Sequence, residues 1–170
     1  ANFSLFDHMA SFLSKQFGTV PVNTHTLKSA LKEYKAPMAK ISLLQREGVI
    51  LNLRRDLYLC LPEDGEGTYS RELVANHLLH PSYVSYETVL SRAGVIPERV
   101  TLLKSSCMKR SKVFDNATGR YEYIQVPEAY FPIGLTRQKT EEGYFYLTAT
   151  PEKALCDLIV SSSNLRIQSM

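Results

Sequence analysis

Apolar residues recur at helical spacing in three stretches of the first third of the chain. The stretches span residues 4–17, 24–34 and 37–47, and each places its apolar positions on one face. Pro37 suits the first turn of the third helix, where the N–H that proline lacks has no helical partner, and Gly48 suits its end. The pattern therefore predicts three helices, the second and third of which are joined by a short turn.

Two β-prone runs follow the third predicted helix. Val49–Leu53 and Leu57–Leu61 flank the polar segment Arg54-Arg55-Asp56, which predicts a hairpin with two arginines at its tip. Two helices joined by a tight turn form a helix-turn-helix. With the hairpin added, the element order is that of a winged helix-turn-helix, and we expect such a domain over residues 1–62.

Positive charge is concentrated in this same segment. Residues 1–62 contain eight Lys and Arg against four Asp and Glu, whereas the rest contains twelve against thirteen. Such an asymmetry favours a polyanionic partner, and we expect double-stranded DNA with the third helix in the major groove. The candidate contacts are Lys35, Lys40, Ser42, Arg46, Arg54 and Arg55. The alternative is that these charges are only solvated surface, because winged helices also dock proteins.

The rest of the chain predicts a second domain, residues 68–170, which contains both helices and strands. The polar, acidic stretch Pro62–Gly67 indicates the boundary, and Asp115–Gly119 is a strong hairpin signal. We expect helices at 70–79, 85–93 and from Thr150 onward, and strands at 100–103, 111–114, 120–126, 133–137 and 144–149. The predicted fold class is α+β, with a mostly antiparallel sheet flanked by helices in this second domain.

The search for catalytic chemistry finds little. There is no glycine-rich phosphate loop, no nucleophile elbow and no pair of inward carboxylates. His77 and His80 have a spacing that could hold a metal, but no third ligand is evident nearby. The three cysteines, Cys60, Cys107 and Cys156, are scattered and favour free thiols in a reducing cytoplasm. We expect no enzyme activity, no cofactor and no metal.

Alternating tyrosines in the second domain leave two interpretations open. They could form a stacking platform for bases, or they could pack across neighbouring strands. The residues are Tyr121, Tyr123, Tyr144 and Tyr146. No apolar run approaches the ~20 residues needed to cross a bilayer, so we expect a cytoplasmic protein with no membrane partner.

Several blocks of the sequence together resemble a known family. They are Tyr58-Leu59, Ala75–Ser85, Glu87, Leu90, Gly94–Glu98, Lys109-Arg110, Phe114, Gly119–Tyr121 and Ala149–Leu158. These blocks resemble the AbiEi-type antitoxins of bacterial type IV toxin–antitoxin, or abortive phage-infection, systems. The resemblance extends over nearly the whole chain, and Ala-Thr-Pro-Glu-Lys-Ala-Leu is its most specific block. One departure is that Asp56-Leu57 precede Tyr58, where the family usually has a glycine.

The resemblance implies two roles. The winged helix would bind inverted repeats in the promoter of its own operon and repress it, which places two copies on the DNA. The C-terminal domain would counter a nucleotidyltransferase-type toxin from the adjacent gene, with direct binding of the toxin left open. Family members commonly continue further than Met170, so a shortened or trimmed chain is expected. Two alternatives remain: a stand-alone transcriptional regulator whose second domain senses a ligand or dimerises, and a nuclease.

The family block around residue 150 also has a purely structural interpretation, which is the one we expect. Thr150 can cap a helix, Pro151 can begin it, and Glu152 can complement its dipole. A functional role for Glu152 or Lys153 stays open. The apolar residues expected to bury this helix are Ala154, Leu155, Leu158 and Ile159.

Overall fold

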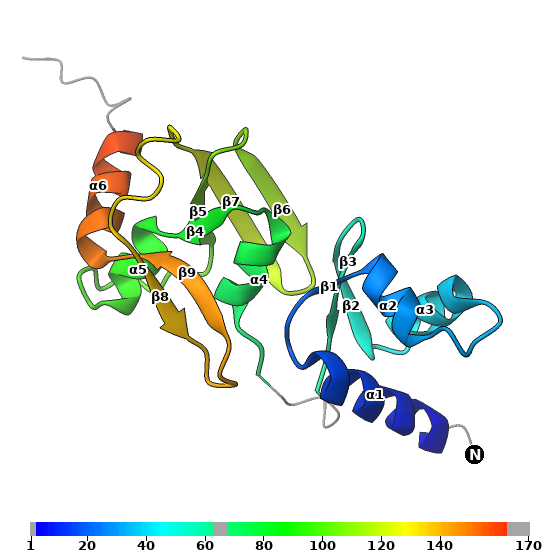
Figure 1. Cartoon of the computed structure of the whole chain (residues 1–170). Coiled ribbons are helices and arrows are strands. Elements are labelled where there is room, and N and C mark those ends of the chain that lie inside the picture. Colours follow the sequence, from blue (N-terminus) through cyan, green and yellow to red (C-terminus); the bar gives the residue numbers. More distant parts are fainter. Residues whose placement is uncertain (1–2, 63–67, 163–170) are drawn as a thin grey trace, which may run out of the picture. The chain divides into compact units, whose positions relative to one another are not determined.

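A computed structural model describes residues 3–62 and 68–162, with side chains from residue 7 onward (Figure 1). The chain divides into two compact units. Unit 1 comprises Ala1–Ser70 and Asn116–Thr118, and unit 2 comprises Arg71–Asp115 and Gly119–Met170. Most of the boundary predicted at Pro62–Gly67 lies outside the described residues. Among the described helices, none has the length and apolar character that a membrane span requires.

Unit 1 combines three helices with a small sheet. Its elements are α1 (Phe3–Phe17), β1 (Val22–Asn23), α2 (Thr24–Ala30), α3 (Pro37–Arg46), β2 (Ile50–Arg54) and β3 (Leu57–Cys60). The strand order is β1-β3-β2, and both pairings are antiparallel. Leu13, Leu27, Ile41 and Leu44 meet in its core and are essentially inaccessible. The three predicted helices and the hairpin are therefore confirmed as elements.

Two local details of unit 1 differ from the sequence prediction. α2 ends at Ala30, four residues before the predicted end, because Leu31 leaves the helical conformation and keeps its side chain in the core. The residue before a proline avoids the helical region, and Ala36 accordingly has φ −133° before Pro37 begins α3. β1 was not predicted, because two residues carry no periodic signal. It exists through its pairing with β3, in which Val22 faces Tyr58.

Unit 2 is a sheet with helices against it. Its elements are α4 (Arg71–Leu78), β4 (Ser82–Val84), α5 (Tyr86–Arg92), β5 (Leu103–Cys107), β6 (Lys112–Asn116), β7 (Gly119–Gln125), β8 (Leu135–Lys139), β9 (Phe145–Ala149) and α6 (Pro151–Ser162). The strand order is β6-β7-β5-β4-β9-β8. An α+β class is confirmed, with six helices and two sheets in the described chain.

The sheet of unit 2 is mixed, with more parallel pairing than the expectation of a mostly antiparallel sheet allowed for. β4 pairs antiparallel with β5, and β8 with β9, but β5 and β7 are parallel, as are β4 and β9. Turn signals in a sequence identify only strands joined by tight turns, and neither parallel pair is joined in that way. β4 itself was missed, since its three residues lie in the connection between two helices.

The helices of unit 2 lie on both faces of this sheet. Successive side chains of a strand point to opposite faces. Ser82 on β4 donates a hydrogen bond to the Ala75 carbonyl of α4, whereas the next residue, Tyr83, donates to Asp157 of α6. α4 and α6 therefore lie on opposite faces, and α5 packs beside α6 (Figure 1).

The buried face of α6 is only partly the predicted one, because Ala154 is buried and Leu158 packs against the core, but the other two predicted residues are exposed. Leu155 and Ile159 are 45% and 60% exposed, whereas Lys153, Ala154 and Asp157 are buried. Helical spacing alone allows either face, and the sequence prediction followed hydrophobicity. The structure instead buries a charged pair with its hydrogen-bond partners, an arrangement that depends on side chains from other elements.

Candidate functional site

The predicted DNA contacts on α3 lie on its outer side. Ile41 and Leu44 are buried in the core, while Ser42 and Arg46 are exposed and Lys40 is half-buried. Lys35 is exposed in the connection just before the helix. The sequence placed these cations correctly relative to the apolar face of α3, because helical periodicity determines both.

These side chains differ in how many contacts they already make within the protein. The Lys40 Nζ lies 4.8 Å from the centroid of the Tyr34 ring. The Ser42 hydroxyl donates to the Met38 carbonyl one turn earlier at 3.1 Å. The Arg46 Nε is 3.9 Å from Glu47, but the Arg46 side chain is 76% exposed and such pairs contribute little. Arg46 therefore keeps most of its capacity to meet a phosphate, while Ser42 is turned back onto its own helix.

The N-terminus of α3 has no side-chain cap, because Ala36 occupies the capping position. The first N–H groups of a helix lack helical partners, and the helix dipole adds partial positive charge there. Lys35 precedes this terminus by two residues and is exposed. This end of α3 is therefore electropositive.

The hairpin tip carries Arg54 and Arg55. Arg55 is exposed, whereas Arg54 is half-buried and donates from its guanidinium to the Arg55 carbonyl at 2.9 Å. Asp56 completes the turn with φ +68°, in the left-handed region that favours glycine but that Asp tolerates.

Asp56 also ties the hairpin tip to the start of α2. Its carboxylate accepts a hydrogen bond from the Thr24 N–H at 3.3 Å, and Asn23 caps the same helix by accepting from Thr26 at 2.8 Å. A hydrogen bond with the Thr24 side chain is the main reason why the pKa of Asp56 lies below its usual value, and the bond from the Thr24 N–H and the charges of Arg54 and Arg55 add to the effect. The position of the tip is therefore defined relative to α2.

The family block in unit 2 forms the beginning of α6. Thr150 accepts a hydrogen bond from the Lys153 N–H at 3.2 Å, and Pro151 occupies the first helical position, so the predicted cap is confirmed. Glu152 is exposed in the first turn. Lys153 is different, because only 5% of it is accessible.

Lys153 belongs to a buried polar cluster centred on Asp157. The Lys153 Nζ donates to the Tyr130 carbonyl at 2.9 Å and lies 3.8 Å from the Asp157 carboxylate. That carboxylate accepts from Ser85 at 2.5 Å, from Tyr130 at 2.7 Å and from Tyr83 at 3.3 Å. Burial raises the pKa of both tyrosines, so each remains a neutral donor. We call these five residues the Asp157 cluster.

The sequence analysis quoted Asp157 in the family block without giving it a role. A signal was available, since a Lys and an Asp four residues apart can pair on one helix face. Burial also lowers the pKa of Lys153, although Asp157 opposes that effect. The Asp157 cluster joins α6 to β4 and to the loop that precedes β8, and its hydrogen bonds give the block a structural role.

Other sequence candidates are accounted for by ordinary contacts. The His77 Nδ1 is 2.9 Å from the Leu73 carbonyl, and the described residues contain no group of three His, Cys, Asp or Glu that could hold a metal. Tyr121 and Tyr123 are 0% and 1% exposed, so the interpretation as a stacking platform was wrong for them. Burial raises the pKa of the Cys60 thiol to about 12, which suppresses its reactivity.

Unit 2 contains a pocket that the sequence did not predict. Its volume is about 460 Å³, and it opens between α5, β8, β9 and the start of α6. The lining residues are Val84, Thr88, Val89, Arg92, Ala93, Thr136, Gln138, Tyr146, Thr148, Ala149, Thr150 and Pro151. They come from five elements and two connections, and for that reason no local motif reveals the site.

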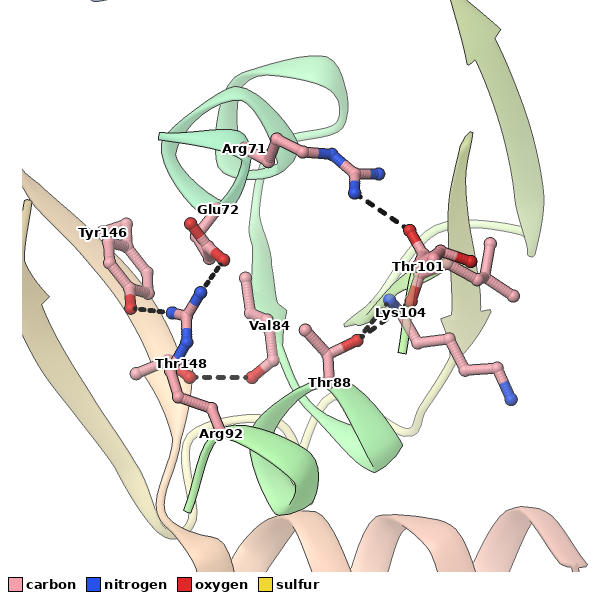
Figure 2. Close-up of polar contacts among 10 residues, drawn as sticks. Arg71, Glu72, Val84, Thr88, Arg92, Thr101, Lys104, Tyr146 and Thr148 are labelled. Atoms are coloured by element: carbon pink, nitrogen blue, oxygen red, sulfur yellow. Dashed lines mark hydrogen bonds and ion pairs between the residues drawn. The ribbon is translucent and has the colours of Figure 1, made fainter. Parts of the chain in front are cut away.

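Among the described residues that line the pocket, Arg92 alone is charged. Its guanidinium lies between Tyr146 and Glu72, donating to the Tyr146 hydroxyl at 2.7 Å and pairing with the Glu72 carboxylate (Figure 2). Burial alone would lower the pKa of Arg92, but these two neighbours outweigh it and the net shift is upward. Arg92 therefore remains a cation held in one orientation by α4 and β9.

Comparisons with known proteins add no relative to this description. A scan against protein-family models found no match to the chain, and a search of curated proteins found none either.

Proposed function

We propose that unit 1 is a winged helix-turn-helix domain that binds double-stranded DNA. The observation that carries the proposal is the succession of α2, a short connection, α3 and the β2–β3 hairpin, in a sheet of order β1-β3-β2. Two helices so joined form a helix-turn-helix, and a hairpin after them is the wing. The excess of Lys and Arg in residues 1–62 supports a polyanionic partner.

The exposed cations suggest a division of labour on DNA. α3 enters the major groove, where base edges offer distinguishable hydrogen-bond patterns. Lys35, Arg46 and the uncapped amides at the start of α3 contact phosphates. Arg54 and Arg55, at the hairpin tip, contact the DNA backbone or bind in the minor groove. Lys40 is the candidate for a base contact, while Ser42 must give up its bond to Met38 to reach one.

The test of DNA binding removes both arginines of the hairpin tip. We expect Arg54→Ala with Arg55→Ala to weaken binding to the promoter and to unrelated duplexes by a similar factor, because phosphate contacts carry no sequence preference. Fluorescence anisotropy with labelled duplexes measures this. The matched control is Lys109→Ala with Arg110→Ala, which removes two exposed cations at consecutive positions of unit 2. Unchanged affinity in the hairpin variant would refute the role of the wing.

For the whole chain, we propose a DNA-binding antitoxin that represses the operon of a type IV toxin–antitoxin system. The resemblance to AbiEi-type antitoxins supports this assignment, with unit 2 countering a nucleotidyltransferase-type toxin. Repression through inverted repeats places two copies on the promoter. Both roles belong to the bacterial cytoplasm, where the DNA and the toxin are found.

Co-expression with the adjacent gene tests the antitoxin role. With both genes under unrelated inducible promoters, we expect the full chain to restore growth that the adjacent gene product inhibits. The hairpin variant, Arg54→Ala with Arg55→Ala, should restore growth equally, because it alters unit 1 alone. An adjacent product that is not toxic, or a toxic one that the wild-type chain does not counter, contradicts the antitoxin assignment.

A stand-alone transcriptional regulator is the second candidate. The specific observation that favours it is the pocket of about 460 Å³ in unit 2, because a regulator that senses a small molecule needs such a site. The two candidates share DNA binding, so the co-expression experiment separates them.

A further inference from the structure

The pocket in unit 2 has the size of a small-molecule site. Its volume of about 460 Å³ lies within the range of roughly 300–1,000 Å³ that such sites occupy. The lining comes from α5, from strands β4, β8 and β9 and from the first residue of α6. β8 is an edge strand of the sheet, so its lining residues can be altered without disturbing the strands at the centre.

Most of the lining offers carbon surface to a ligand. Val84, Val89 and Ala149 are apolar. The hydroxyls of two lining threonines are already engaged with the backbone: Thr88 donates to the Leu102 carbonyl and accepts from the Lys104 N–H, and Thr148 donates to the Val84 carbonyl (Figure 2). The pocket thus suits a ligand with an apolar body.

Arg92 and Tyr146 place two strong hydrogen-bond donors in the lining, beside the polar side chains of Thr136, Gln138 and Thr150. A guanidinium has five N–H donors, and the bonds to Tyr146 and Glu72 use two of them in the described part of the chain. The Tyr146 oxygen accepts the bond from Arg92, which leaves its own proton to be donated elsewhere. Burial raises the pKa of Tyr146, so that proton is retained at neutral pH.

Two donors on neighbouring atoms, one of them cationic, match the two oxygens of a carboxylate. Glu72 reduces the net attraction for an anion, but its carboxylate is not part of the lining, and its side chain is only 13% exposed. At one end of the pocket, the first turn of α6 contributes the positive end of a helix dipole.

We propose that this pocket binds a small organic monocarboxylate, whose carboxylate accepts hydrogen bonds from Arg92 and Tyr146 and whose apolar body lies against Val84, Val89 and Ala149. The inference rests on unit 2 alone. It stands whether or not unit 1 binds DNA, because none of these contacts involves the first unit.

Titration of the full chain with matched probes tests the proposal. The probes are benzoate and hexanoate, each compared with its uncharged amide, benzamide or hexanamide, and binding is followed by amide chemical shifts in two-dimensional NMR. For molecules of this size we expect dissociation constants on the order of millimolar. Each carboxylate should bind about tenfold or more tightly than its amide, with shifts concentrated at the pocket residues. Equal binding of acid and amide, or shifts elsewhere only, overturns the proposal.

Two variants and a control sharpen the test. Arg92→Gln should weaken carboxylate binding about tenfold or more while leaving amide binding unchanged. Because that variant leaves Glu72 without its cation, a second variant, Thr136→Trp, fills the pocket from the edge strand and should abolish the shifts with Arg92 intact. Arg137→Gln, one residue further along β8 and outside the lining, removes an equal charge and should have no effect. Carboxylate binding that survives Thr136→Trp would locate the site elsewhere.

Discussion

At the scale of single residues, two glycines share the same backbone conformation but differ in how closely other atoms surround them. Gly94 and Gly134 both have φ +70°, a conformation that residues with a side chain rarely adopt. A Cβ on Gly94 would meet nothing within 4 Å, whereas a Cβ on Gly134 would lie 2.8 Å from the Cβ of Lys153. The backbone at Gly134 therefore lies directly against the buried lysine of the Asp157 cluster.

Replacing each of these glycines by alanine should lower the free energy of unfolding by a different amount. Gly94→Ala should destabilise unit 2 by about 1 kcal/mol, because it introduces strain alone. Gly134→Ala should cost about 1–3 kcal/mol more, since it also forces the Lys153 side chain and its neighbours apart. Urea unfolding followed by tyrosine fluorescence measures both, as the chain has no tryptophan and most of its tyrosines belong to unit 2. Equal destabilisation would show that Lys153 moves aside without cost.

At the scale of elements, the Asp157 cluster explains how α6 is held. Two of the four apolar residues predicted to bury α6, Leu155 and Ile159, are exposed, so only Ala154 and Leu158 add apolar packing. Hydroxyl donors from β4 and from the loop before β8 converge on Asp157 instead, and Lys153 supplies the opposite charge. A buried pair of this kind becomes costly when only one partner is removed.

Replacing the Asp157 carboxylate by an amide of nearly the same size should therefore lower the stability of unit 2 strongly. Asp157→Asn should destabilise unit 2 by about 3 kcal/mol, because Lys153 stays buried without its counter-charge and one of the two acceptor oxygens is replaced by an NH2 group that faces a hydroxyl donor. The matched control is Leu155→Gln on the exposed side of α6, which should stay within about 0.5 kcal/mol. The same unfolding assay compares the two. If Asp157→Asn unfolds at the urea concentration of the wild type, the cluster does not anchor the helix.

At the scale of the whole molecule, charge is distributed unevenly along the chain. The net charge is +3, yet residues 63–170 contain one more Asp or Glu than Lys or Arg. In the proposed function, long-range attraction to DNA therefore originates in residues 1–62. Each phosphate contact releases counterions, so the dependence of affinity on salt counts the contacts.

The expected number of phosphate contacts is about four to six per copy, given the cations on α3, before it and on the hairpin. The logarithm of the association constant should then fall with the logarithm of salt concentration at a slope of about −4 to −5 per copy. Arg55→Ala alone should reduce the magnitude of that slope by about 1. Anisotropy titrations at several salt concentrations give both values. A slope near zero would exclude the proposed electrostatic contact with duplex DNA.

The amino-acid sequence by itself determined the local elements of this protein. The helices of unit 1, the hairpin after α3, the cap at Thr150 and the turn before β7 all followed from periodicity, capping residues and turn residues, which act over a few neighbouring positions. The exposure of Arg46 and Arg55 followed from the same patterns. These signals are local, so they could be read without knowing what else each segment contacts.

Only the tertiary structure decided which distant segments meet. β1 and β4 exist because longer strands pair with them, and the parallel pairs of unit 2 join strands that no tight turn connects. Arg92 donates to Tyr146, 54 positions further along the chain, and Asp157 accepts from Tyr83 and Tyr130 in distant segments. The physical reason is that burial of a charge depends on partners far away in sequence, and one-dimensional spacing carries no record of them.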